Sequence, residues 1–449
     1  MLCLGKRGRQ RAEMGGNKDD PNCPKNTMKS QESLTSQESS LMSQSSLYSE
    51  HSLKSVTSLQ SEFSLRSQPS IQSYNSLASV PSIGTTQQTS EGCYSYSYRC
   101  IATVTVEGQG GNVFSLATAE ADLVYSGSSG SEIRVWKKNQ AELIQECGIM
   151  GQGKGKAGVK CIVVAGDRIY SAHQDHRIRV WRRFESQQHK LVASVPTIKD
   201  YLMTFMVPRN HVKVRRHRKV LWIQHVDTIS ALAVDRKGFL YSASWDRTVK
   251  IWRPSDFRCI ESFRAHDDAI NALVVSGDGF LYTGSADARV KVWNKAPGEK
   301  RHSLVATLER HKSSINALAL SASDSALLYS GACDRSIIVW EREESAQHMT
   351  VVGALRGHRR AVLCLATVGE MVCSGSADKT VRVWRRGGGN SHWCVAVLDG
   401  HRGPVKAISV AASPSFYGCF VYTGSLDHDI KLWCVSHDDD EDRPEKITF

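Results

Sequence analysis

The chain has 449 residues, 13 cysteines and a formal net charge of +12, and this length is sufficient to bury a large core. No run of about 18 apolar residues occurs, and residues 1–7 lack the apolar stretch of a signal peptide. We therefore expect neither membrane insertion nor secretion. The cysteines form no CxxC pair and no Cys/His group with zinc spacing. This usage predicts reduced thiols in an intracellular protein, without a metal or another cofactor.

The positive net charge favours contact with anions. It does not by itself indicate nucleic acid, because the chain has no DNA- or RNA-binding motif and no interleaving of basic and aromatic residues. We therefore expect a monomeric chain whose direct partners are other proteins rather than DNA or RNA.

Residues 1–92 form a Ser-rich leader. Between Ser30 and Ser90, 21 of 61 residues are Ser, and few are aromatic. Such a composition buries too little apolar surface to offset the conformational entropy lost on folding. We expect a disordered leader that kinases can phosphorylate; an inert linker is the alternative.

After the leader, nearly the same phrase recurs seven times and ends in Trp. The seven residues are Trp136, Trp181, Trp252, Trp293, Trp340, Trp384 and Trp433. Their spacings are 45, 71, 41, 47, 44 and 49 residues, and a period of about 40–45 residues is typical of β-propeller blades. We predict an all-β fold, a seven-bladed propeller over residues 93–435, followed by an acidic tail at 436–449.

One repeat shows how a blade is encoded. Residues 281–285 alternate as a strand does, 286–289 form a turn, and 290–293 return as a second alternating strand. Residues 269–275 form the preceding inner strand, with His266 just before it. No strand is left for the last blade after Trp433, so we predict that residues 99–106 complete it and close the ring.

The last five repeats share a His before the inner strand, a Ser or Thr ten residues before the Trp, and an Asp six residues before it. These positions are His225, Ser242, Asp246 and Trp252; His266, Thr283, Asp287 and Trp293; His311, Ser330, Asp334 and Trp340; His358, Ser374, Asp378 and Trp384; and His401, Thr423, Asp427 and Trp433. This pattern resembles the WD40 family. The resemblance implies a buried chain of hydrogen bonds from Trp through Ser/Thr and His to Asp, which must be fully satisfied to stabilise a blade.

The first two repeats depart from this pattern. Repeat 1 has Gly130 in place of the Asp and no His, and repeat 2 has Asp175 but no His, with Gly158 near that place. We expect these two blades to depend more on apolar packing than on a polar chain.

The spacing between Trp181 and Trp252 reveals an insertion at residues 196–224. From the strand order we expect it on the face of His225 and Asp246, overhanging blades 2 and 3. Residues 200–206 should form a short helix with Tyr201, Leu202, Phe205 and Met206 on one apolar face.

A basic run follows this helix, namely Lys213, Arg215, Arg216, Arg218 and Lys219. It predicts a docking patch for an acidic partner or a nuclear address; a solvated loop is the alternative. Residues 201–225 closely resemble the corresponding segment of the plant JINGUBANG-type WD40 proteins. That resemblance implies a regulatory protein of the cytoplasm and nucleus that binds transcription regulators.

The residues next to the turn Asp positions should face partners: Gln174, Trp245, Cys333, Ala377 and Leu426. Trp245 is the strongest candidate, because an exposed Trp is costly unless it is used and Trp is enriched at binding hot spots. Packing beneath the insertion is the alternative for Trp245.

We expect no catalysis. Residues 148–154 fit GxxxxGK, but Gly155 replaces the required Ser/Thr, and the recurring Ser, His and Asp are already explained by the blades. The leading function is a non-enzymatic interaction scaffold. The alternative is a substrate receptor of a cullin-RING ubiquitin ligase, because Arg183, Arg342 and Arg386 each follow an Asp…Trp-x pattern that resembles a ligase-adaptor motif.

Overall fold

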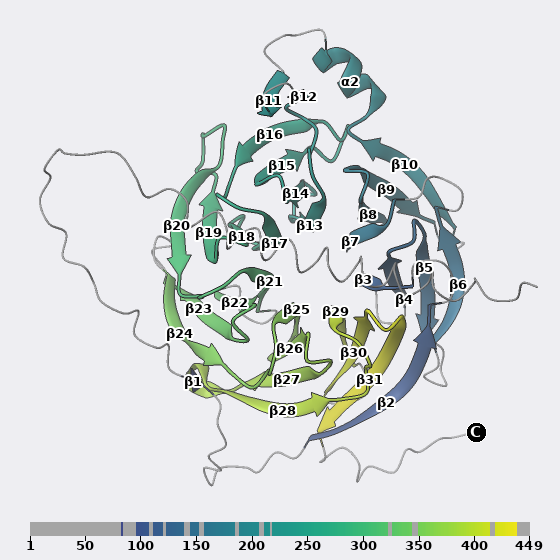
Figure 1. Cartoon of the computed structure of the whole chain (residues 1–449), viewed down its shortest axis with the longest axis vertical. Helices are drawn as coiled ribbons and strands as arrows, with labels where there is room; N and C mark the ends of the chain where they lie inside the picture. The colour runs from purple at the N-terminus through teal and green to yellow at the C-terminus, as the bar shows by residue number, and fades with distance from the viewer. Residues whose placement is uncertain are drawn as a thin grey trace, which may run out of the picture. The chain divides into compact units, whose positions relative to one another are not determined.

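The computed structural model describes residues 82–83, 96–106, 111–119, 123–138, 144–151, 157–184, 188–205, 211–215, 218–321, 326–343, 349–413 and 418–437. Nearly all of the leader and residues 438–449 of the acidic tail, with their predictions, lie outside these residues, whereas Ser436 and His437 belong to the last strand of the propeller rather than to the predicted tail. Seven four-stranded antiparallel sheets are arranged around an axis (Figure 1), with the first strand of each innermost. The predicted seven-bladed β-propeller is confirmed.

Blade 1 comprises β3 (Val113–Ala119), β4 (Leu123–Ser128), β5 (Ile133–Lys138) and β6 (Ile144–Met150). Blade 2 comprises β7 (Val159–Ala165), β8 (Arg168–His173), β9 (Ile178–Arg183) and β10 (His189–Val195). Blade 3 comprises β13 (Ile229–Val234), β14 (Leu240–Ser244), β15 (Thr248–Trp252) and β16 (Cys259–Arg264). Blade 4 comprises β17 (Ile270–Val275), β18 (Leu281–Ser285), β19 (Arg289–Asn294) and β20 (Ser303–Glu309).

Blade 5 comprises β21 (Ile315–Leu320), β22 (Leu327–Ala332), β23 (Ile337–Arg342) and β24 (Met349–Leu355). Blade 6 comprises β25 (Val362–Val368), β26 (Met371–Ser376), β27 (Val381–Arg386) and β28 (His392–Leu398), with the 3-10 turn η2 (Gly388–Asn390) before β28. Blade 7 comprises β29 (Val405–Ala412), β30 (Gly418–Ser425), β31 (Asp429–His437) and β2 (Tyr96–Thr105).

Blade 7 joins the two ends of the repeat array. Strand β2 pairs antiparallel with β31, from Tyr96 opposite His437 to Thr105 opposite Asp429. The predicted closure is confirmed, and the strand begins three residues earlier than predicted. Because β2 covers the outer edge of β31, the ring closes with a strand from the opposite end of the array.

Blade 5 carries an additional short strand from the leader. Strand β1 (Ser82–Ile83) pairs in parallel with Ala354 and Leu355 of β24. The prediction of a wholly disordered leader is therefore wrong at these two residues. The outer edge of a blade offers unpaired backbone N–H and C=O groups, which accept a further strand.

The core lies between the blades. Seven apolar clusters each combine side chains of two neighbouring blades, and each contains one of the seven repeat Trp residues. Trp181 of blade 2, for example, packs with Tyr125 and Ile133 of blade 1. Burying such side chains contributes roughly 1.5–3 kcal/mol each relative to exposure, so the repeat Trp residues link each blade to the preceding one.

The insertion begins with helix α2 (Ile198–Phe205) and continues with the hairpin β11 (His211–Arg215) and β12 (Arg218–Leu221). The predicted helix is confirmed but begins earlier, because Thr197 caps it. The Thr197 hydroxyl accepts from the Asp200 backbone N–H at 3.2 Å, and the Asp200 carboxylate accepts from the Thr197 N–H at 3.1 Å.

The position of the insertion differs from the prediction. Figure 1 shows α2 and the hairpin outside the ring, beyond β10 and β16, rather than across a face. The Arg258 guanidinium of blade 3 lies 3.6 Å from the Asp200 carboxylate, which holds α2 at the rim. Within the helix, Leu202 is 67% exposed whereas Asp200 is buried; the side chains of Phe205 and Met206, which complete the predicted apolar face, lie outside the described residues. Within the described residues, no helix has the length and apolarity to cross a membrane.

Candidate functional site

The last five blades contain the same buried polar chain. In each, the His Nδ1 lies 2.8–3.0 Å from an Asp carboxylate oxygen, and its Nε2 lies 2.8–2.9 Å from the Ser/Thr hydroxyl. The Trp Nε1 donates to the same hydroxyl at 2.8–3.0 Å. Because a carboxylate only accepts, Nδ1 must donate to it, and in the neutral ring Nε2 then accepts the hydroxyl proton.

These contacts stabilise ionised Asp residues inside the propeller. Burial alone would raise the pKa of Asp246, Asp334, Asp378 and Asp427, but the His contacts and backbone N–H groups outweigh it and lower each pKa. Burial lowers the pKa of His225 despite the neighbouring Asp246. The repeated polar residues are thus buried or nearly so and hydrogen-bonded to one another within each blade.

The Asp residues also shape the turns of one face, which we call the upper face: the end of the propeller that carries the turns between the second and third strands of the blades. Asp246 Oδ1 accepts from the Thr248 backbone N–H at 2.9 Å, and Arg247 between them has a positive φ of 71°. The residues before these Asp residues lie on this face. Trp245 is 40% exposed, Gln174 and Cys333 are exposed, and Ala377 and Leu426 are half-buried.

Blade 2 has a polar chain that the repeat pattern did not predict. Trp181 Nε1 donates to Ser171 Oγ at 3.0 Å, and this hydroxyl lies 2.8 Å from His173 Nε2. His173 Nδ1 lies 3.2 Å from the carbonyl oxygen of Ala157. His173 therefore replaces the missing His from within β8, and a backbone carbonyl replaces the Asp. The signal in the sequence is a His two residues after the repeat Ser.

Blade 1 keeps only the first link of the chain. Trp136 Nε1 donates to Ser126 Oγ at 2.7 Å, and the Gly130 backbone N–H donates to Ser128 Oγ at 3.2 Å. The expectation of predominantly apolar packing therefore fits blade 1, whereas it is wrong for blade 2, where the buried His173 extends the polar chain.

A β-bulge recurs near the start of the innermost strand of every blade. The bulged residues, one from each blade in order, are Phe114, Lys160, Ser230, Asn271, Asn316, Leu363 and Lys406. A bulge re-aims a side chain out of the regular alternation. Because these strands surround the axis and begin at the upper face, the bulges form an inner ring there, and all seven residues are half-buried.

The inner ring has two different halves. In blades 3 to 5 its polar residues bond to the next blade, as when Asn271 Nδ2 donates to the Ile315 carbonyl at 2.9 Å and Asn316 Nδ2 to the Val362 carbonyl at 2.8 Å. In the other half, Lys160 Nζ lies 4.0 Å from the centroid of the Phe114 ring. Among the described residues, neither Lys160 nor Lys406 forms a salt bridge.

The two inner-ring lysines destabilise each other's charge. Burial lowers the pKa of Lys160 to about 8, and repulsion from Lys406 contributes. Burial also lowers the pKa of Lys406. These two partly desolvated cations lie in the inner ring at the upper face. The repeat pattern alone predicted no functional residue there.

The predicted basic run lies mostly in the rim hairpin. Lys213 is opposite Lys219 and Arg215 is opposite Arg218 in the β11–β12 register, whereas Arg216 lies outside the described residues. The register thus places four positions of the run opposite one another in one hairpin.

The three candidate arginines for a ligase adaptor are not equivalent. Arg342 is largely buried, forms a 2.6 Å salt bridge with Asp278, and lies over the Phe280 ring with 4.7 Å to its centroid. Arg386 contacts Glu370 at 3.8 Å, and Arg183 is half-buried. The structure thus joins Arg342 to the neighbouring blade 4.

The ten cysteines of the described residues are free, and no metal-binding group of His, Cys, Asp or Glu occurs among these residues.

Comparison with known proteins agrees with this geometry. The family model described as "WD domain, G-beta repeat" matches residues 218–253, 257–294, 302–341, 349–385 and 392–434. A stretch of 70 residues is 33% identical to the Polycomb protein esc of Drosophila melanogaster and covers 15% of each chain. Another of 74 residues is 32% identical to the probable cytosolic iron-sulfur protein assembly protein 1 of Neurospora crassa and covers 16% of each chain. Five of the seven blades thus match the WD40 repeat, and they form part of a seven-bladed β-propeller.

Proposed function

We propose that this propeller is a non-enzymatic interaction scaffold whose upper face binds an acidic segment of another protein. The observation that carries the proposal is the pair of inner-ring cations, Lys160 and Lys406. Both are half-buried, both have lowered pKa values, and neither has a carboxylate partner among the described residues.

An anion bound at Lys160 and Lys406 would be energetically favourable. A partly buried charge without a counter-ion costs free energy, because water is replaced by a less polar surrounding. A carboxylate that bonds both ammonium groups would offset this cost, and charge-assisted hydrogen bonds are roughly twice as strong as neutral ones. Phe114 between the two blades adds an apolar surface against which the stem of an acidic side chain can pack.

The rest of the upper face suits a protein segment rather than a small ion. Trp245 and Gln174 are exposed beside the turns of blades 3 and 2, and Trp is enriched at binding hot spots. The turn Asp carboxylates bind the His residues of their own blades, and none of them forms a salt bridge with Lys160 or Lys406 among the described residues. An extended acidic segment running from blade 7 across blades 1 and 2 to blade 3 would meet both lysines, Phe114 and Trp245.

The identity of the partner follows from the resemblance to the JINGUBANG-type proteins. On that basis we propose that the chain is a plant regulatory protein, present in cytoplasm and nucleus, and that its partners include transcription regulators. The basic hairpin at the rim supports either a second contact with an acidic partner or recognition by an import receptor. The cullin-RING alternative is weaker, because Arg342 is already bonded to Asp278.

Binding of a fluorescein-labelled peptide of alternating Glu and Gly, measured by anisotropy, tests the central proposal. Replacing Lys160 and Lys406 by Gln should weaken binding at least about 10-fold, since a hydrogen bond to a charged group contributes roughly 1.5–3 kcal/mol. The matched control replaces the exposed Lys312 and Lys379, on turns of the same face, by Gln. Equal losses in both variants would show diffuse attraction only and contradict the proposal.

The pH dependence provides an independent readout of the same site. The charged form of Lys160 is lost as pH rises through its pKa of about 8, so affinity should fall between pH 7 and pH 9. Surface lysines titrate near 10.4, so binding through them would stay constant over this range. A flat profile would therefore exclude Lys160 from the contact.

The rim hairpin is tested separately by replacing Lys213, Arg215, Arg216, Arg218 and Lys219 with Gln. Exposed charges contribute little to stability, so the melting temperature should be unchanged. Partner capture should weaken and lose part of its salt dependence, because exposed charges act over about 10 Å at 0.1 M salt. Loss of nuclear entry alone would identify the run as an address, and no change at all would identify a solvated loop.

A further inference from the structure

Three seams between blades contain a Tyr of one blade beside a His of the next. At the first and fifth seams the pair is closed by a hydrogen bond: Tyr125 Oη lies 2.9 Å from His189 Nε2, and Tyr329 Oη lies 3.0 Å from His392 Nε2. Both pairs are edge-to-face, with ring centroids 5.5 Å and 5.7 Å apart. In each pair the Tyr lies in the second strand of its blade, and the His begins the outer strand of the next blade.

The seam between blades 3 and 4 has the same two residues but a different connection. The rings of Tyr241 and His302 remain edge-to-face at 5.9 Å, yet the Tyr241 hydroxyl donates to Asp235 at 3.5 Å. His302 donates through Nδ1 to Glu261 at 2.8 Å, and its backbone N–H also donates to Glu261 at 2.8 Å. Among the residues that the structure describes, none hydrogen-bonds His302 Nε2.

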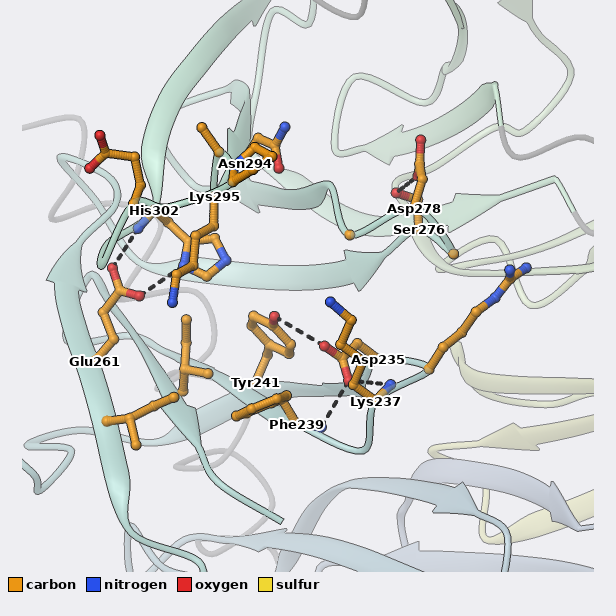
Figure 2. A pocket seen from close by; sticks show the side chains of 18 of the residues that line it. Asp235, Lys237, Phe239, Tyr241, Glu261, Ser276, Asp278, Asn294, Lys295 and His302 are labelled. Carbon is orange, nitrogen blue, oxygen red and sulfur yellow. Dashed lines mark hydrogen bonds and ion pairs between the residues drawn. The ribbon is translucent and has the colours of Figure 1, made fainter.

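This seam opens into a pocket of about 400 Å³ (Figure 2), a size in the range of small-ligand sites. Its walls come from the turns between the first and second strands of blades 3 and 4 and from the turn before β20. These turns lie at the end opposite the turn Asp residues, so the pocket opens on the lower face. It is therefore separate from the inner ring and from Trp245.

The pocket combines apolar walls with a surplus of unpaired cations. Phe239, Ile251 and Ile260 line it, and Ile260 is 38% exposed. The carboxylates of Asp235, Glu261 and Asp278 are already bonded, to turn N–H groups, to His302 and to Arg342 respectively.

The basic residues are not engaged in this way. Arg236, Lys237 and Lys295 line the pocket and are exposed, and none of them forms a salt bridge within the described part of the chain. Glu299 is an exposed carboxylate that lines the same pocket and offsets part of the charge of these three cations. Among the described lining residues, the charged side chains that are not already hydrogen-bonded or ion-paired are three cations and one carboxylate, so direct ion pairs are open mainly to an anionic group.

We propose that this lower-face pocket binds a ligand that carries a phosphate or carboxylate group on an apolar ring or chain. The anionic group would lie between Lys237 of blade 3 and Lys295 of blade 4, and the His302 ring would form part of the pocket wall. The apolar part would pack on Phe239 and Ile260. Glu261 accepts two hydrogen bonds from His302 and so fixes the orientation of its ring before a ligand binds. Glu261 itself would not touch the ligand.

Burial by itself would raise the pKa of Glu261, but the two hydrogen bonds from His302 outweigh it and lower the pKa of this carboxyl. Glu261 is thus held as a carboxylate that accepts from the His302 Nδ1–H and backbone N–H. Nε2 of His302 has no hydrogen-bond partner among the described residues and stays open to a ligand. The two closed seams lack this capacity because Tyr hydroxyl groups occupy the corresponding nitrogens.

Isothermal titration calorimetry of the full chain with phenyl phosphate and with benzoate tests the proposal. At least one should bind with a Kd on the order of 1 mM or below, as ligand efficiencies for small molecules allow. Replacing Lys237 and Lys295 by Gln should weaken that binding at least about five-fold. Benzyl alcohol, which has the ring but no charge, should bind at least about five-fold more weakly than the anions.

The inner ring provides the decisive control, since it too attracts anions. The Lys160→Gln and Lys406→Gln double variant should keep the phenyl phosphate binding that the Lys237 and Lys295 variant loses. If this variant loses binding and the pocket variant keeps it, the proposal is wrong and the ligand occupies the inner ring. Binding of benzyl alcohol equal to that of the anions would likewise overturn it, as would the absence of any binding at 10-fold the expected Kd.

A spectroscopic readout locates the ligand within the chain. The ¹⁵N resonance of His302 Nε2 should shift on addition of phenyl phosphate, whereas that of His392, whose nitrogen is bonded to Tyr329, should not. His302→Gln assigns the resonance. This variant leaves Glu261 with a buried, less well compensated charge, so the lysine variants rather than His302→Gln carry the affinity test.

Discussion

Blades 3 to 7 and blades 1 and 2 share strand order, the inner bulge and the bond from Trp to a hydroxyl, but they differ in where the polar chain ends. In blades 3 to 7 it ends at an ionised Asp, in blade 2 at the Ala157 carbonyl, and in blade 1 at Ser126. The five family matches cover the first group only. All blades thus satisfy the Trp N–H, whereas the group at the far end of the polar chain differs and is an Asp only in blades 3 to 7.

The less regular blades also supply distinctive surface. Phe114 and Lys160 of the inner ring belong to blades 1 and 2, and the rim hairpin follows blade 2. Blades 3 to 5 use the same ring positions for bonds to the next blade. Two of the three candidate contacts of the inner ring therefore belong to the least regular blades, and the third, Lys406, belongs to the neighbouring blade 7.

The largest effect should come from opening blade 7, which has a complete polar chain. Deleting residues 1–107 removes β2 and exposes the edge of β31, so we expect aggregation. Deleting residues 1–92 removes β1 but keeps β2, and this protein should remain soluble and folded. Soluble yield and thermal melting measure both. Equal behaviour of the two truncations would show that ring closure does not limit the stability of this blade.

Acid should weaken blade 2 through His173. Burial lowers the pKa of His173 to about 4 from an ordinary value of 6.5. The unfolded chain therefore binds the proton more tightly, so stability is complete above pH 6.5 and is lost as pH falls through 4. The free energy of unfolding should fall by about 3 kcal/mol in total, because one proton is bound and each pKa unit corresponds to about 1.36 kcal/mol. His173→Gln should flatten stability between pH 6.5 and 4; an unchanged slope would contradict this.

Removing the terminal Asp should separate the two groups of blades. Asp287→Ala leaves His266 Nδ1 without its carboxylate, at a cost of about 1–3 kcal/mol. Asp175→Ala is the matched change in blade 2, where the Asp binds Arg179 near the surface and not the His. It should cost less than about 1 kcal/mol. Urea unfolding measures both, and equal losses would remove the distinction between the groups.

The smallest effect should come from adding the Asp that blade 1 lacks. Gly130→Asp supplies a carboxylate where no His is present, so no chain can form, and the free energy of unfolding should change by less than about 0.5 kcal/mol. Differential scanning calorimetry provides the measurement. A gain above 1 kcal/mol would mean that the Asp stabilises its turn independently of the network.

Much of this fold could be predicted because its period is local. A hydroxyl ten residues and an Asp six residues before each Trp define a strand, a turn and a return strand, so seven copies fix seven blades, and the missing last strand predicts β2. The repeat pattern did not predict the role of His173, because the corresponding His of blades 3 to 7 lies before the inner strand rather than in the second strand. The position of α2 escaped it too, since a 3.6 Å contact between Asp200 and Arg258 decides it.

The sequence by itself determined the blade count, the closing strand and the polar chains of blades 3 to 7, because each depends on residues within one repeat or on the number of strands. Only the tertiary structure decided which residues of different repeats meet. Lys160, Phe114 and Lys406 share one ring because bulges at equal places in three blades turn toward one axis. Tyr241 and His302 line an open pocket because Asp235 and Glu261 bind their polar atoms. Such outcomes depend on competition between neighbours from separate blades, which no single repeat encodes.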